Sequence, residues 1–180
     1  MLNAYIMKSK KLLEITRLIE GEKVCLEPFS YKRMLKFYAL YQTSHKHWEQ
    51  FIVLHFQGIE DVKKFIAQQQ RDSFVGYFIL EKKSYRPIGF ILGDEISASE
   101  MSLTRAIGVS YEGRGYAYEA RKLLEQTLRN AGYASIVSFC DAENQHSKEL
   151  LQRDNYVQEG SQRLAFGPVS MELEVYRKIL

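Results

Sequence analysis

Residues 101–130 read MSLTRAIGVS-YEGRGYAYEA-RKLLEQTLRN and contain a change of pattern at Gly115. Apolar and small residues alternate from Met101 to Val109, with Arg105 alone out of step, which predicts a strand over 101–109. After Gly115 the apolar residues recur three and four positions apart, the period of an amphipathic helix. Gly132 is expected to end that helix. The stretch therefore predicts a strand, a glycine turn and a helix.

A strand that turns through Gly113 and Gly115 into a helix aims unpaired main-chain N–H groups at one point. The positive end of the helix dipole adds to them, so the turn is suited to an anion. The spacing excludes a Walker A loop, because no Lys-Ser or Lys-Thr pair follows. A dinucleotide fingerprint is excluded as well, since Tyr118 stands where its third glycine belongs. A short diphosphate cradle and a plain tight turn both remain open.

Two motifs in this chain resemble those of a known family. The sequence EGRGYA at 112–117 is similar to the Gln/Arg-x-x-Gly-x-Gly/Ala motif of the GNAT superfamily of N-acetyltransferases. Residues 144–147 (NQHS) and 155–160 (NYVQEG) resemble the Asn-x-x-Ser and Gly-Phe-x-x-Glu-Gly motifs of its Rim-type branch, which acetylates the N-termini of ribosomal proteins. The two motifs stand in the family's order, and a looser likeness extends over most of the chain.

The resemblance implies an α/β (α+β) fold: a mixed, mostly antiparallel sheet of about seven strands with helices on both faces. The strands at 101–109 and 134–140 would be parallel neighbours that splay apart. The pantetheine arm of acetyl-CoA would lie between them and pair with the free backbone edge of Ile107 to Val109. Its diphosphate would bind the glycine turn, and no metal is implied. The residues expected to contact acetyl-CoA are Ile107, Gly108, Val109, Gly113, Arg114, Gly115, Tyr116, Ala117 and Asn144.

The implied reaction is direct transfer of an acetyl group to a primary amine in a ternary complex. Many family members protonate the leaving thiolate with a tyrosine, but Leu151 stands at that position. The Rim-type branch points to Ser147 instead, although a serine there is also a favoured helix cap. The glutamate that partners this serine in the branch falls at Phe166. Glu100, at the start of the predicted strand, is the candidate for the missing base.

Several other side chains have two readings. Glu112 is expected to point outward, because a carboxylate beside a diphosphate is unfavourable, while Arg114 either reaches a phosphate or is solvated. Asp94 and Glu95 are read as ordinary turn residues. The cluster of His45, His47 and Trp48 either lines the acceptor pocket, as the resemblance implies, or is a surface loop anchored by one buried aromatic.

Length and composition restrict the class of protein. A chain of 180 residues is expected to be one domain, 1–180, with 1–18 as a lead-in. Lys and Arg total 25 against 22 Asp and Glu without a basic cluster, so we expect no nucleic-acid partner. Cys25 and Cys140 form neither a disulfide framework nor a metal-ligand spacing. With no membrane-spanning run and no signal peptide in view, we expect a cytoplasmic monomer or homodimer.

The remaining elements follow from periodicity and turn residues. Asn155 is expected to end the helix at 145–153 in the left-handed conformation. Residues 93–99 are read as a polar link, and 41–58 have no firm assignment. Strands are expected at 23–28, 74–81, 87–92, 134–140, 156–166 and 170–178, and helices at 31–41, 60–70 and 145–153.

Two functions of other classes stay open beside acetyl transfer. One is a CoA-binding sensor of the same fold without catalysis, which the substitutions at Leu151 and Phe166 favour. The other is a protein-interaction module in which the glycine turn is only a turn. Binding of acetyl-CoA would distinguish a CoA-binding sensor from a protein-interaction module. Release of free thiol would distinguish a transferase from both.

Overall fold

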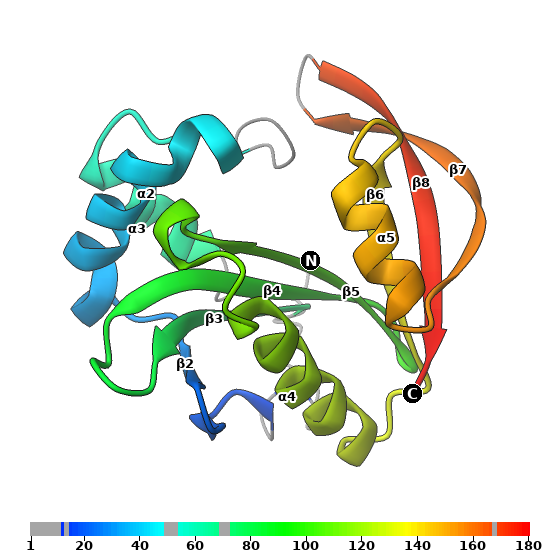
Figure 1. Cartoon of the computed structure of the whole chain (residues 1–180), viewed down its shortest axis with the longest axis horizontal. Coiled ribbons are helices and arrows are strands. Elements are labelled where there is room, and N and C mark those ends of the chain that lie inside the picture. The colour runs from blue at the N-terminus through cyan, green and yellow to red at the C-terminus, as the bar shows by residue number, and fades with distance from the viewer. Residues whose placement is uncertain (1–11, 13–14, 49–53, 69–72, 167–168) are drawn as a thin grey trace, which may run out of the picture.

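The computed structural model describes residues 12, 15–48, 54–68, 73–166 and 169–180 (Figure 1). Within these residues, eight strands form one sheet in the order β1-β2-β3-β4-β5-β6-β8-β7, antiparallel except for β5 and β6. The strands are β1 (Ile19–Glu20), β2 (Val24–Pro28), β3 (Phe74–Glu81), β4 (Pro87–Ser97), β5 (Glu100–Ile107), β6 (Ser135–Asp141), β7 (Val157–Phe166) and β8 (Val169–Ile179). The helices are η1 (Tyr31–Arg33), α2 (Met34–Trp48), α3 (Ile59–Gln68), η2 (Val109–Tyr111), α4 (Tyr116–Asn130) and α5 (Gln145–Arg153).

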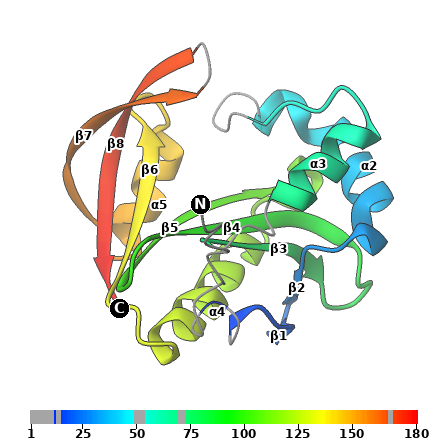
Figure 2. The same cartoon turned by 180° about the vertical axis from the view of Figure 1, so that it is seen from behind.

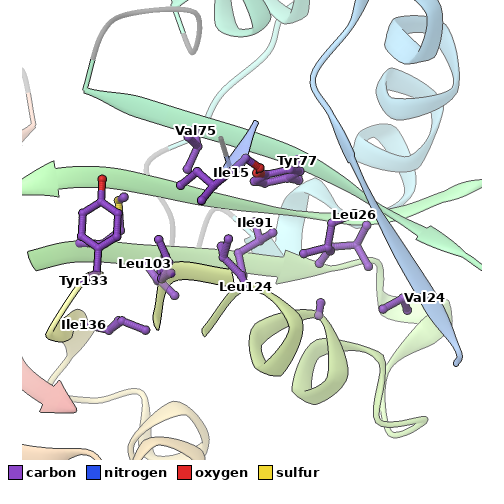
Figure 3. Close-up of a cluster of buried hydrophobic side chains, with 14 of the residues drawn as sticks. Ile15, Val24, Leu26, Val75, Tyr77, Ile91, Leu103, Leu124, Tyr133 and Ile136 are labelled. Atoms are coloured by element: carbon purple, nitrogen blue, oxygen red, sulfur yellow. The ribbon is translucent and has the colours of Figure 1, made fainter. Parts of the chain in front are cut away.

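Helices cover both faces of the sheet, as the resemblance implied. The apolar stripe of α4 (Ala120, Leu124 and Leu128) packs on one face, together with Leu151 of α5. Figure 3 shows Leu124 facing Leu103 and Ile91 on the sheet. On the other face, α2 and α3 bury an aromatic-rich core against Phe78 and Phe90 of the central strands. In Figure 1 these two helices lie on the far side of β3, β4 and β5 from α4.

The helix that follows the glycine turn ends as predicted. Gly132 adopts a positive φ of 83°, which a residue without Cβ adopts at little cost. Its N–H donates to Arg129 O (2.9 Å), and the N–H of Tyr133 donates to Leu128 O (3.0 Å). These two bonds are the Schellman arrangement, which satisfies carbonyls left open at a helix end.

The parallel strands β5 and β6 are paired over only three positions, from Glu100 opposite Ser135 to Ser102 opposite Val137. Beyond them the Ser138 hydroxyl donates to Leu103 O at 3.4 Å. From there β6 stays with β8 while β5 stays with β4, and the ribbons separate (Figure 2). The predicted splayed parallel pair is therefore present.

Three expected boundaries were wrong. The polar residues 93–97 continue β4, because they pair with β5 from Gly93 opposite Leu103 onward. The strand predicted over 101–109 ends at Ile107, since η2 begins at Val109. Residues 41–48 extend α2, and the buried Trp48 in its last turn explains why the helix continues.

The other boundaries that fall within the described residues agree closely; the expected end of the helix at 60–70 lies outside them. The helix at 145–153 is confirmed, and Asn155 beyond it has a φ of 65°, in the left-handed region as expected. Gly167 and Pro168, expected to separate the last two strands, lie outside the described residues. None of the described helices is long and apolar enough to cross a membrane.

Candidate functional site

The glycine turn presents a row of main-chain donors at the start of α4. Gly113 and Gly115 have φ values of 71° and 79°, in the left-handed region that favours glycine. Gly115 is the N-cap of α4 and supplies no side-chain cap. In the described part of the chain, the N–H groups of residues 113–117 have no hydrogen-bond acceptor. Free amides at the positive end of a 15-residue helix form a site for an anion.

Lys23, which the sequence did not single out, adds a cation to this turn. Its Nζ donates to Arg114 O at 3.4 Å, and a Cβ on Gly115 would lie 3.4 Å from the same nitrogen. Glu119 fixes this position, because its Oε1 accepts from the Lys23 N–H (2.8 Å) and the Val24 N–H (3.4 Å). Lys23 is 92 positions from Gly115, so no local pattern in the sequence could have indicated the contact.

Side chains of the turn are tied to their surroundings. The Tyr116 hydroxyl donates to Glu81 Oε1 (2.8 Å), and this hydrogen bond raises the pKa of Tyr116. Arg114 Nη2 donates to Ser110 O (2.9 Å), so the guanidinium folds back along the loop. The exposed Glu112 points outward, as expected, and its Oε1 lies 2.9 Å from His47 Nε2.

The end of β5 is held by α2 and is less open than expected. Trp48 Nε1 donates to Ile107 O (2.8 Å), and Ser44 Oγ accepts from the Val109 N–H (3.4 Å). The Gly108 N–H donates to Ile88 O (2.8 Å). The expected free edge over 107–109 was therefore wrong. Because Gly108 faces β4, the Ile107 N–H points to the splayed side and is the donor left there.

One interpretation of residues 45–48 was a surface loop anchored by a buried aromatic residue. The structure shows the last turn of α2 there instead of a loop. The buried aromatic was expected correctly: Trp48 is buried, and its indole packs edge-on against Phe90 with the ring centroids 5.3 Å apart. This turn of α2 therefore positions the end of β5 and, through His47, the glycine turn.

The start of α5 lies on the opposite side of the splay. Asn144 is the N-cap, and its side-chain oxygen accepts from the Ser147 N–H at 3.0 Å. The expectation that Ser147 is the cap was wrong, because it stands three positions later. The thiol of Cys140, near the end of β6, donates to Asp141 O (3.4 Å) and Asn144 O (3.7 Å), and burial raises its pKa. The first turn of α5, which contains Ser147, therefore lies at the end of β6, where the two strands have separated.

The neighbouring strand β8 completes this side of the splay. Burial raises the pKa of Tyr176 to about 12, so its phenol stays protonated and donates to Glu174 Oε2 at 2.7 Å. Lys148 Nζ lies 3.5 Å from Glu174 Oε1 and donates to Ala142 O (2.7 Å). These bonds hold the first turn of α5 against the sheet.

Glu100 lies at the closed end of the splay, away from the turn. Its Oε2 accepts from the Ser135 hydroxyl (2.8 Å) and forms a salt bridge with Arg177. Seven strand positions separate it from Ile107, about 23 Å at the usual rise per residue. A base committed to these two partners at that distance does not fit the reaction.

Asp94 has a position that the sequence did not indicate. It lies within β4, directly opposite Ser102, and not in a turn. The side chains of Asp94, Ser102 and Thr104 lie on the face of the sheet that α2 and α3 cover. Thr104 is exposed although β5 is a central strand. Burial raises the pKa of the Asp94 carboxyl, and a hydrogen bond from Ser73 opposes that rise. Among the described residues, no group of three or more His, Cys, Asp and Glu side chains is placed to hold a metal.

Comparison with known proteins gives the family. Residues 23–154, most of the chain, match the model of the acetyltransferase (GNAT) domain. No curated protein sequence matches the chain.

Solved structures share the fold at low identity. A "probable" GNAT-family acetyltransferase from Chromobacterium violaceum has a TM-score of 0.82 and 20% identity. The match covers 99% of this chain and 92% of the Chromobacterium chain. The microcin C7 self-immunity acetyltransferase MccE, solved with acetyl-CoA and AMP, has a TM-score of 0.79 and 20% identity, with 89% and 94% covered. The ribosomal L7/L12 α-N-protein acetyltransferase RimL, solved with coenzyme A, has a TM-score of 0.81 and 16% identity, with 91% and 98% covered.

The splayed β5–β6 pair, the free amides before α4 and the family match agree with one another. The chain belongs to the GNAT family of acetyltransferases and is an acyltransferase.

Proposed function

We propose that this protein transfers an acetyl group from acetyl-CoA directly to a primary amine within a ternary complex. The observation that carries the proposal is the row of free N–H groups at residues 113–117 beside a parallel pair that separates after three positions. The complexes of MccE with acetyl-CoA and of RimL with coenzyme A, both of the same fold, support the choice of donor.

The glycine turn is assigned to the diphosphate. The N–H groups of residues 113–117 donate to no acceptor in the described part of the chain, and they lie at the positive end of the α4 dipole. A doubly charged anion suits both features. Lys23, directly before β2, adds an ammonium. We assign the pantetheine arm to the splayed side of β5, where the Ile107 N–H is the donor left open.

The reaction needs a neutral amine, a stabilised oxyanion and a way to receive the leaving sulfur. Ser147 is assigned to the sulfur, because it stands in the first turn of α5, which Cys140 contacts through Asn144 O at the separated end of β6. Asp94 is assigned to the amine proton, which it takes through a water. Burial makes this carboxylate more basic than an exposed aspartate, and it lies on the opposite face of the sheet from Ser147.

The acceptor is proposed to be a protein N-terminus or a small primary amine. RimL, by its description, acts on a ribosomal protein, which supports the first. Thr104 and Ser102 leave a small-residue strip beside Asp94, so an extended chain or a compact amine has room to approach. We place the reaction in the cytoplasm, carried out by one domain as a monomer or homodimer.

The test is release of free thiol from acetyl-CoA with a panel of amines that includes N-terminal peptides. Thiol release that requires an amine supports transfer. Binding of acetyl-CoA without thiol release from any amine would make the protein a sensor. Absence of a thermal shift would make the glycine turn only a turn, because a ligand at a hundred times its Kd stabilises a protein by about 2.7 kcal/mol.

In the same assay Asp94→Asn tests the proton acceptor. We expect kcat to fall roughly a hundredfold, since general bases contribute on that order, and the acid limb of the pH profile to disappear. Asp94→Asn is expected to lower kcat but to raise the free energy of unfolding. A carboxyl with a raised pKa in the folded protein destabilises the fold as pH rises through that pKa, so the amide is expected to be more stable at neutral pH. An unchanged kcat and pH profile would remove Asp94 from the mechanism.

A further inference from the structure

Arg105 is the residue that breaks the apolar alternation of β5. It stands opposite Ile91, whose side chain belongs to the core under α4, so the guanidinium points to the α4 and α5 face. The strand has already separated from β6 at this position, because pairing stops at Ser102. Arg105 is half-buried and lies two residues before Ile107, the position assigned to the pantetheine arm.

The guanidinium of Arg105 enters a cluster with a surplus of positive charge. Arg121 forms an ion pair with Asp154, and Lys178 Nζ lies 2.8 Å from Glu125 Oε2. The outer Lys122, 40% exposed, also reaches Glu125 at 3.4 Å. Two buried carboxylates thus already have cationic partners before Arg105 is counted.

Arg105 itself has no hydrogen bond or salt bridge within the described ranges. Burial and the charge of Arg121 lower its pKa, while Tyr156, Asp154 and Glu125 act the other way. A cation withdrawn from water without a bonded partner is costly, so its retention here requires a compensating anion. Asp154 and Glu125, the carboxylates that act on Arg105, are already paired with Arg121 and Lys178, so an anion of the substrate can complete the balance.

Ser147 is assigned to the leaving sulfur, but the tyrosine acid of many family members has no counterpart here. Leu151, at the position of the family's tyrosine, is buried in the core and offers no hydroxyl. We propose that Arg105 places a fixed positive charge beside the thioester of bound acetyl-CoA and stabilises the thiolate that leaves. This rests on the proposed function.

The acetyl transfer needs no reactant other than acetyl-CoA and the amine. The amine nitrogen forms a bond to the carbonyl carbon, the carbon–sulfur bond breaks and its electron pair stays on sulfur. The proton lost by the amine passes to the base, and the thiolate remains as an ion held by the guanidinium until it is protonated or released. A fixed charge in a site shielded from water stabilises such an ion more than solvent does.

The test is Arg105→Gln in the thiol-release assay. Removing one preorganised stabiliser of this kind typically lowers kcat by a factor of about 100 or more, and we expect the Kd of acetyl-CoA to stay within about threefold. Arg105→Lys retains the charge and is expected to retain more than a tenth of kcat. Lys122→Gln, an outer cation of the same cluster, is the matched control and is expected to leave kcat unchanged.

A second readout separates catalysis from packing. In Arg105→Ala, added guanidinium ion is expected to restore kcat several-fold, whereas tetramethylammonium at the same concentration is not. Equal rescue by both salts, a kcat of Arg105→Gln within threefold of the parent, or a folded Arg105→Lys as impaired as Arg105→Gln would overturn the inference. Should the Gln variant not fold, the Lys variant and the rescue decide. A parent protein without any transfer would defeat the proposed function instead.

Discussion

The two helix starts that face the splayed strands are built in opposite ways. The start of α4 is a bare glycine cap in the left-handed conformation, followed by amides with no acceptor in the described protein. The start of α5 is closed by Asn144, whose side chain takes up the Ser147 N–H. A helix start normally finds side-chain or water partners for its free N–H groups. Only the first of these two is left for a ligand to complete.

The difference divides the work between the two ends. The open start of α4, with Lys23 nearby, binds an anion. Its donors are main-chain N–H groups, so a side-chain substitution can change their direction but cannot remove them. A closed start is rigid, and it fixes the direction of the side chains that follow it. We therefore assign binding of the diphosphate to α4 and the chemistry at sulfur to Ser147 on α5. The predictions below separate the two.

The largest expected effect is at the closed start. Ser147→Ala is expected to lower kcat roughly a hundredfold, the size of a typical acid–base contribution, with the Kd of acetyl-CoA within threefold. The physical reason is that the leaving sulfur loses its hydroxyl donor while the binding amides remain. Steady-state thiol release and equilibrium binding measure the two quantities. Ser147→Thr keeps a hydroxyl and is the control. If the alanine variant were as fast as the parent, α5 would have no part in the chemistry.

At the open start, Gly115→Ala is expected to weaken acetyl-CoA binding by about 2 kcal/mol, close to thirtyfold, as a charge-assisted hydrogen bond is lost. A Cβ strains a φ of 79° and turns the amides away from their common point. Titration calorimetry gives the Kd. Gly132→Ala is the matched control, because it carries the same strain at the other end of the same helix, at φ 83°. Equal weakening by both variants would show that only helix stability matters.

The smallest expected effect comes from Asn144. Asn144→Ala is expected to cost about 1 kcal/mol of unfolding free energy, the usual value of a helix cap, because the Ser147 N–H loses its acceptor. Acetyl-CoA binding is expected to change less than threefold. Denaturant unfolding measures the first and calorimetry the second, and Asn144→Asp, which keeps the cap, is the control. Strong loss of binding with unchanged stability would reverse the assignment and make Asn144 a ligand contact.

Much of the fold could be predicted because local patterns and tertiary needs agree. The nine residues of α5 and the left-handed Asn155 after it follow from period and turn chemistry alone. Where local patterns and tertiary needs disagree, the sequence did not predict the element correctly. Residues 93–97 are polar, yet they form a strand because β5 pairs with them. The last turn of α2 is mixed in character, and it is helical because Trp48 is buried against the end of β5.

The candidate site divides in the same way. The glycine turn is local, so its left-handed residues and open amides could be expected from the sequence. Lys23, Trp48 and Asp94 reach the site only through long-range pairing of strands and helices, which a single sequence does not encode in any short pattern. Glu100 was misleading for the same reason, since its partner Arg177 is 77 positions away.

Residue-resolved amide hydrogen exchange, with and without coenzyme A, tests the central claim most directly. We predict that the N–H groups of residues 113–117 exchange rapidly in the free protein and are protected at least tenfold when coenzyme A is bound. The Ser147 N–H, already bonded to Asn144, is predicted to change far less. Binding of coenzyme A that leaves the exchange of residues 113–117 unaltered would contradict the account.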